Sequence, residues 1–171
     1  IASNYDYVVC NVDYRLLRDQ NNSVTFDELI GDAFGALLWI KENITKYKGN
    51  KDSIAVTGDS AGAYISAMIV NSGNNISRSG SFPENFSIKP SYIPESITSE
   101  DIKNKNLLDV QAAVLSYGGY NLYSPALKGI LESRKNPFWM MALSKPRGIF
   151  GNNYNAKTNP CLLYTSDAAD E

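Results

Sequence analysis

The apolar positions near the start of the chain follow first a strand pattern and then a helix pattern. Residues 5–12 (Tyr-Asp-Tyr-Val-Val-Cys-Asn-Val) form a β-favouring run, which predicts a buried strand followed by a polar loop. Further on, apolar residues recur at helical spacing: Ile30, Phe34, Leu37, Ile40 and Ile44. Thr25 and Glu28 have the spacing of a capping box, and residues 46–49 supply a basic last turn and a glycine stop. The pattern predicts a helix between residues 25 and 49.

A second strand and a second helix follow directly. Residues 53–57 (Ser-Ile-Ala-Val-Thr) read as a strand, and residues 61–70, rich in Ala, Ile and Met, read as a helix. Residues 109–117 restore a strand pattern, which Gly118 and Gly119 end. Because strands and helices alternate, we expect an α/β fold with parallel strands joined by right-handed crossovers. We expect one domain over residues 1–160.

Two later stretches lack strand alternation. Residues 73–106 are rich in Ser, Asn and Pro, which predicts a long loop or insertion with a short helical turn near residues 98–103. Residues 125–150 include the run Phe-Trp-Met-Met at 138–141. A helical cap over the sheet is the preferred interpretation, and ordinary core-facing helix positions are an equal alternative.

Neither end of the chain looks like a natural terminus. The chain opens with Ile1 inside a predicted strand, so we expect the natural start to be absent. Residues 161–171 match an in-frame translation of a transposon-type sequencing adapter, and we expect them to be a processing scar. Without their three acidic residues, 15 Asp+Glu stand against 16 Lys+Arg, and the net charge changes from −2 to +1. Cys10 is then the one native cysteine.

Composition excludes several classes of protein. The chain is 43% hydrophobic and 20% charged, which suits one globular domain with a core. No stretch approaches the ~18–20 apolar residues of a membrane span, and the near-neutral charge without basic clusters gives no support for nucleic-acid binding. The sequence has no metal-ligand cluster and no phosphate loop, so we expect no metal and no cofactor. The sequence also has no His, so these residues supply no imidazole for catalysis.

The run Gly58-Asp59-Ser60-Ala61-Gly62 has the form G-x-S-x-G. Its position between a predicted strand and a predicted helix is the context of a nucleophile elbow. Ser60 should then adopt a positive φ, and Gly58 and Gly62 should lie too close to the neighbouring helix and strand to carry a Cβ. Because a helix starts after Ser60, the Ala61 N–H is the expected oxyanion donor. Asp59 is interpreted as bonding to nearby backbone, with tuning of Ser60 as the alternative, and a glycine-flanked N-cap serine is the non-catalytic hypothesis.

Several segments together resemble a known family. They are Tyr7 to Leu16, Asp32-Ala33, Trp39 to Ile44 and Ile54 to Gly62. Over residues 5–72 the chain is similar to the middle of an α/β-hydrolase of the hormone-sensitive-lipase-like esterase group, and residues 110–122 and 148–160 resemble it more loosely. The resemblance implies a partial α/β-hydrolase fold in which Ser60 is the acyl nucleophile and the Ala61 N–H an oxyanion donor. It also implies a structural role for Asp32. The family's His-Gly-Gly-Gly loop, which supplies further donors, is absent.

The catalytic machinery is incomplete in these residues. A serine hydroxyl needs an adjacent base, and in α/β-hydrolases an Asp or Glu and then a His follow the nucleophile. We expect both beyond Pro160, so the chain as given should have negligible turnover, uncovered apolar surface and poor solubility. Asp13 and Arg15 are expected to bond locally behind the sheet, with contact to the substrate as the alternative.

The predicted function is that of a serine carboxylester hydrolase acting on small-molecule esters with short acyl groups. Two alternatives stay open: a non-catalytic ligand-binding relative that keeps the serine without the His, and a serine peptidase on the same fold. The sequence predicts neither the compartment nor the oligomeric state.

Overall fold

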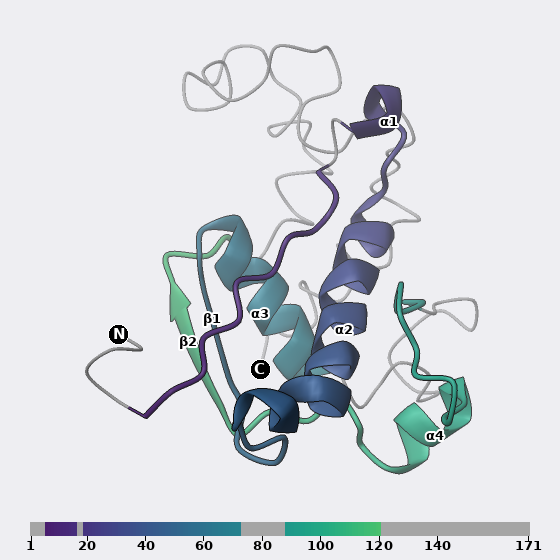
Figure 1. The fold of residues 1–171 in the computed structure, drawn as a ribbon. Coiled ribbons are helices and arrows are strands. Elements are labelled where there is room, and N and C mark those ends of the chain that lie inside the picture. Colours follow the sequence, from purple (N-terminus) through teal and green to yellow (C-terminus); the bar gives the residue numbers. More distant parts are fainter. Residues whose placement is uncertain (1–5, 17–18, 73–87, 121–171) are drawn as a thin grey trace.

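The computed structural model describes residues 6–16, 19–72 and 88–120 (Figure 1). Its elements in chain order are α1 (Asp19–Asn22), α2 (Phe26–Asn43), the 3₁₀ helix η1 (Ile44–Tyr47), β1 (Ala55–Asp59), α3 (Ala61–Ser72), α4 (Ser99–Asn104) and β2 (Ala112–Ser116). Strands β1 and β2 pair in parallel, with a register that runs from Ala55 opposite Ala112 to Asp59 opposite Ser116. The predicted α/β fold with parallel strands and crossover helices is therefore confirmed.

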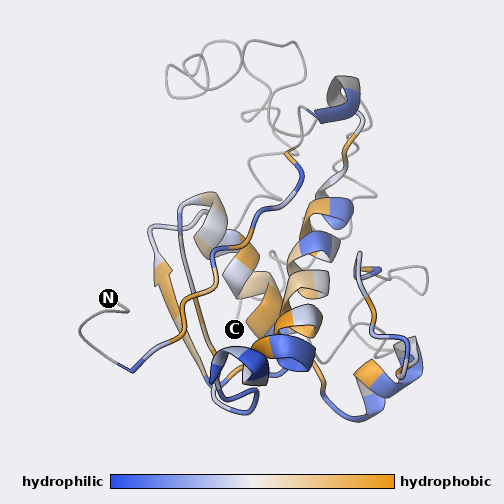
Figure 2. Cartoon of the chain, in the orientation of Figure 1, coloured by the Kyte–Doolittle hydropathy of each residue, from blue (hydrophilic) through white to orange (hydrophobic). Residues whose placement is uncertain are grey.

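The core lies where α2 and α3 pack together beside the two strands. Phe34 and Ile30 of α2 are fully buried, and Met68 of α3 is 1% exposed. Ile88, Ile102 and Leu108 complete this cluster from the second half of the described chain. Burial of each large apolar side chain contributes roughly 1.5–3 kcal/mol, so this cluster supplies much of the stability. Figure 2 shows that β2 is also hydrophobic along most of its length.

Local signals at both ends of α2 explain its length. The Thr25–Glu28 capping box forms as predicted, and the Thr25 N–H donates to Glu28 Oε2 at 2.9 Å. At the other end α2 passes into η1, and Lys48, with φ 64°, adopts the left-handed conformation that a glycine often takes at a helix end. Gly49 is needed for a different reason, because a Cβ there would lie 2.5 Å from Ile44 Cγ1. The helix therefore ends close to the predicted glycine, but the residue at position 49 has to be a glycine because Ile44 packs against it.

The prediction of a strand over residues 5–12 is wrong for the residues that the structure describes. Residues 6–16 form an extended segment without strand pairing (Figure 1). Tyr7 is 65% exposed and Val9 is 62% exposed, so this run is not buried either. A strand requires a neighbour that completes its backbone hydrogen bonds, and the described part of the sheet consists of β1 and β2. Propensity alone could not supply that neighbour.

The remaining predicted segments fare differently. The strands expected at 53–57 and 109–117 and the helix expected at 61–70 correspond to β1, β2 and α3. Helix α4 lies where a short helical turn was expected. The proposed cap at 125–150, the stretch 73–87 and the proposed adapter at 161–171 lie outside the described residues. No helix in the described ranges combines the length and apolar character needed to cross a membrane.

The segment that precedes α4 lies tightly against α2. A Cβ on Gly31 would lie 2.4 Å from the Lys89 carbonyl oxygen, and one on Gly35 would lie 2.6 Å from Ser91 Oγ. The Ser91 N–H also donates to the Gly31 carbonyl at 3.0 Å. Gly31 and Gly35 lie one helical turn apart on the same face of α2, and their lack of side chains lets residues 89–92 pack directly against the helix.

Candidate active site

Ser60 is the single residue between the end of β1 and the start of α3. Its φ is 54°, in the left-handed region that non-glycine residues seldom adopt, as the sequence predicted. Ser60 is exposed at the carboxyl end of the strand. Backbone strain of this kind costs about 1–3 kcal/mol and persists only where the surroundings impose it.

Backbone hydrogen bonds on both sides impose the conformation of Ser60. Its N–H donates to the Ser116 carbonyl of β2 at 3.0 Å, and its carbonyl accepts from the Tyr64 N–H of α3 at 3.2 Å. The turn is thus fixed to the neighbouring strand and to the first turn of the helix. Because the Ser60 N–H already has an acceptor, it is not free to stabilise an oxyanion.

The two glycines of the motif differ in their surroundings. A Cβ on Gly58 would lie 2.3 Å from the carbonyl carbon and 2.4 Å from the carbonyl oxygen of Gly62, so the predicted steric demand holds there. A Cβ on Gly62 would meet nothing within 4 Å. The steric expectation for Gly62 is therefore wrong. The close approach brings the backbone of Gly62 against the Cα of Gly58, so only Gly58 has to lack a side chain.

The start of α3 provides the geometry expected for an anion site. Ala61 is the first residue of this 12-residue helix. The first N–H groups of a helix have no intrahelical acceptor and lie at the positive end of the helix dipole. Asp59 is the last residue of β1, exposed and opposite Ser116. The roles of Ala61 as oxyanion donor and of Asp59 beside the serine stay predictions.

Sequence reasoning missed the part that β2 plays at this turn. Ser116 holds Ser60 through its backbone carbonyl, to which no side-chain motif points. The signal that could have found it is the parallel order of the two strands, since the carboxyl ends of neighbouring parallel strands lie at one edge of the sheet.

A second cluster of charged groups joins residues 6–16 to α2. Arg15 donates from Nε to Asp32 Oδ2 and from Nη2 to Asp32 Oδ1, both at 2.8 Å. Its Nη1 donates to Glu28 Oε1 at 3.1 Å, and its backbone N–H donates to Asp32 at 3.0 Å. These partners of Arg15 lie on α2, 13 and 17 residues away in the sequence. The structural role that the resemblance implied for Asp32 agrees with this geometry.

The electrostatics of this cluster follow from its geometry. Burial opposes ionisation of Asp32, whose side chain is 13% exposed, but the hydrogen bonds and charge of Arg15 prevail and hold its pKa below the usual range. The pKa of Glu28 is lowered chiefly by the hydrogen bond from the Thr25 backbone. The pKa of Arg15 is raised, first by its hydrogen bonds to Asp32. Arg15 thus forms ion pairs with both Asp32 and Glu28, which tie residues 6–16 to α2.

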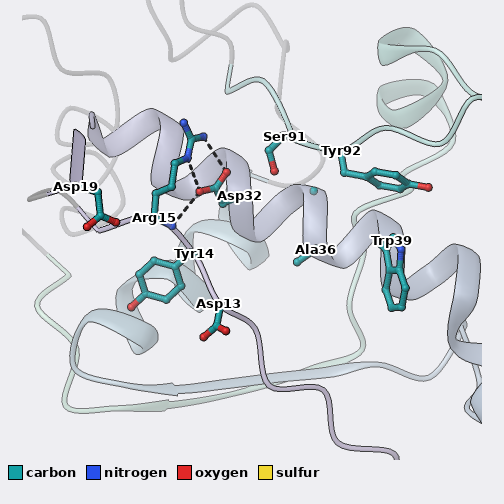
Figure 3. A pocket seen from close by; sticks show the side chains of 10 residues that line it. Asp13, Tyr14, Arg15, Asp19, Asp32, Ala36, Trp39, Ser91 and Tyr92 are labelled. Atoms are coloured by element: carbon teal, nitrogen blue, oxygen red, sulfur yellow. Dashed lines mark hydrogen bonds and ion pairs between the residues drawn. The ribbon is translucent and has the colours of Figure 1, made fainter. Parts of the chain in front are cut away.

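The same cluster borders an open pocket of about 590 Å³, shown in Figure 3. The pocket is lined by Asp13, Tyr14, Arg15, Asp19, Asp32, Gly35, Ala36, Trp39, Ser91 and Tyr92. Arg15 faces Asp32 at one end, and Trp39 and Tyr92 lie at the other. Ser60 and its neighbours do not line this pocket. The pocket and the candidate nucleophile are therefore separate features of the described residues.

Metal chemistry has no visible basis in the residues that the structure describes. They include no group of three or more His, Cys, Asp or Glu side chains placed to hold a metal ion. The cluster of Arg15, Glu28 and Asp32 joins one guanidinium to two carboxylates and ties residues 6–16 to α2. Among the described residues, Ser60 and the start of α3 remain the predicted site of chemistry.

Comparisons with known proteins place these features in context. The chain is 38% identical over 71 residues to Carboxylesterase 5A of Mus musculus, which covers 38% of this chain and 12% of that protein. It is 40% identical over 62 residues to Carboxylesterase NlhH of Mycobacterium tuberculosis, covering 36% of the chain and 18% of the relative. Esterase LipQ of the same organism is 41% identical over 51 residues, covering 30% and 12%. No solved structure matches the chain significantly.

The matched relatives are all much longer than the aligned part of this chain, which spans 12–18% of their lengths. A family model covers far more of the sequence, since BD-FAE matches residues 2–161. That range includes both strands, the turn at Ser60 and all described helices. The expected likeness to the hormone-sensitive-lipase-like esterase group is borne out by this match and by the esterase relatives. The chain belongs to the BD-FAE family, whose domain is α/β-hydrolase-like.

Proposed function

We propose that this protein is a serine carboxylester hydrolase that cleaves small-molecule esters with short acyl groups, with Ser60 as its nucleophile. The observation that carries the proposal is the left-handed Ser60 between β1 and α3, with a glycine at 58 that has no room for a side chain. Relatives named as carboxylesterases and an esterase support this choice over other reactions on the same fold.

The proposed reaction proceeds by acyl transfer in two steps. The Ser60 hydroxyl attacks the carbonyl carbon of the ester while a general base accepts its proton. The resulting oxyanion accepts a hydrogen bond from the Ala61 N–H at the positive end of α3. Collapse of this intermediate expels the alcohol, which takes up the proton, and leaves an acyl-serine ester. Attack by water then releases the acid and restores Ser60.

Neither of the two usual partners of a nucleophilic serine, a His or a Lys in a Ser-x-x-Lys arrangement, is present in these residues. The chain contains no His, and no serine in it is followed by Lys at the third position. We propose that the base is a His held by an orienting acid, which in α/β-hydrolases come after the nucleophile in the chain order Ser, acid, His. The Ser60 N–H cannot replace the missing oxyanion donors, because it donates to Ser116.

The test is hydrolysis of p-nitrophenyl butyrate by protein expressed from the full natural reading frame. Ser60→Ala is compared with wild type and with Ser53→Ala, a control at an exposed serine just before β1. We expect Ser60→Ala to lower kcat by at least about 10³-fold while Ser53→Ala retains activity, because only Ser60 bonds to the acyl group. Turnover that survives Ser60→Ala would overturn the assignment. A full frame that lacks a later His and shows no turnover would favour the non-catalytic ligand-binding alternative.

A further inference from the structure

The two paired strands leave the sheet in the same unusual way. The last registered pair is Asp59 opposite Ser116, and the next residue on each strand is Ser60 and Tyr117. Both have positive φ, 54° for Ser60 and 42° for Tyr117. The carbonyl that accepts from the Ser60 N–H belongs to the peptide that joins Ser116 to Tyr117. Tyr117 therefore stands next to the proposed nucleophile, one strand away, which is a spacing of about 4.8 Å.

Tyr117 does not gain burial in return for this strained backbone. It is 77% exposed, the largest exposed fraction among the described large hydrophobic residues. A positive φ in a bulky aromatic residue is uncommon, and such strain tends to persist at functional sites. Glycine would fit this backbone conformation better, and two glycines follow immediately. Neither local propensity nor core packing explains an aromatic residue here.

A second aromatic residue lies at the same edge. Tyr120 is 40% exposed, and a Cβ on Gly118 would lie 2.6 Å from its ring atom Cε1. The ring of Tyr120 thus folds back over the backbone of Gly118, just after Tyr117. The carboxyl end of β2 therefore carries aromatic surface beside Ser60 that the described residues leave accessible.

We propose that Tyr117 is a specificity-determining residue that contacts the acyl group of the ester bound at Ser60 and, among short acyl groups, favours the longer ones, such as hexanoate over acetate. This inference rests on the proposed function. A ring at an edge where parallel strands end is placed to lose water contact when an apolar group binds beside the nucleophile, and burial of apolar surface is favourable roughly in proportion to its area. Short acyl groups that do not reach the ring gain nothing from it.

The experiment measures kcat/KM for p-nitrophenyl acetate, butyrate and hexanoate with protein from the full natural reading frame. Tyr117→Gly removes the ring and suits the left-handed backbone, so it should preserve the fold, whereas Tyr117→Phe keeps the ring. Tyr47→Ala removes a tyrosine that is 58% exposed on η1 and serves as the control. We expect Tyr117→Gly to lower the hexanoate-to-acetate ratio of kcat/KM about tenfold, and Tyr117→Phe and Tyr47→Ala to leave it unchanged.

If Tyr117 has only a structural role, Tyr117→Gly lowers kcat/KM for all three esters in parallel. An unchanged hexanoate-to-acetate ratio of kcat/KM in Tyr117→Gly therefore overturns the inference. If turnover still depends on Ser60 in that case, the proposed function stands. Turnover that does not depend on Ser60 overturns the proposed function, and the inference with it. A loss of kcat/KM that is specific to hexanoate in Tyr117→Gly and absent in Tyr117→Phe supports both the inference and the proposed function.

Discussion

Replacing each glycine of the elbow motif by alanine should have opposite effects on stability. In Gly58→Ala the new Cβ would lie 2.3 Å from the carbonyl carbon and 2.8 Å from the Cα of Gly62, where ordinary contact begins near 3.4 Å. The obstacle is backbone, so β1 and the start of α3 must separate by about 1 Å. Overpacking of this kind costs about 1–3 kcal/mol, and we expect a loss of about 2 kcal/mol in the free energy of unfolding.

Gly62→Ala makes the same chemical change four residues away. Its Cβ meets nothing within 4 Å, and the residue lies in α3 with an ordinary φ. Alanine lowers the entropy of the unfolded chain and favours helix, so we expect a gain of about 0.4–1 kcal/mol. The two variants should therefore differ by about 3 kcal/mol, which is roughly a hundredfold difference in the folding equilibrium constant.

Urea unfolding of wild type and both variants, followed by far-UV circular dichroism, measures these free energies. The protein is expressed from the full natural reading frame, so that each variant is compared in the same fold. Equal stability of Gly58→Ala and wild type would refute the close approach of β1 and α3. Equal losses in both variants would refute the distinction between the two glycines.

Two further predictions concern the parts of the chain that pack on α2. Asp32→Asn should lower the free energy of unfolding by about 1.5–3 kcal/mol at pH 7, because Arg15 loses a charged partner. Since the folded-state pKa of Asp32 lies below its unfolded value, the stabilisation is full above about pH 4 and disappears as the pH falls through the folded pKa, so urea unfolding of variant and wild type should converge there. Gly35→Ala should cost about 1–3 kcal/mol by thermal or urea unfolding, because its Cβ meets Ser91 and the Tyr92 N–H at 2.6 Å; an unchanged midpoint would show that this segment does not lie on the helix.

Elements with local signals were predictable from the sequence. The capping box at Thr25, the helical spacing of Ile30 and Phe34, and the strand, turn and helix around Ser60 each depend on residues close together in the chain. The run at residues 5–12 shows the limit of this approach, because its β-favouring residues require a neighbouring strand that local sequence cannot reveal. The end of the helix shows another limit of prediction from local sequence. Lys48 adopts the left-handed conformation, whereas Gly49 lacks a side chain because Ile44 packs against it.

The site was predictable where its geometry follows from one turn and not where it depends on neighbours. The positive φ of Ser60 and the steric demand at Gly58 follow from a sharp strand-to-helix turn. The open space at Gly62 depends on which elements surround the helix, which the motif does not encode. Arg15 likewise finds Asp32 across 17 residues of sequence, and only the fold brings them together.

The central claim is that Ser60 is an acyl-accepting nucleophile, and covalent capture tests it most directly. Protein from the full natural reading frame is treated with diethyl p-nitrophenyl phosphate, digested, and mapped by mass spectrometry. The account predicts one diethylphosphoryl group on the peptide containing Ser60, its absence in Ser60→Ala, and loss of ester hydrolysis in proportion to labelling. Complete inhibition with the label on another residue, or hydrolysis that persists in fully labelled protein, would contradict it.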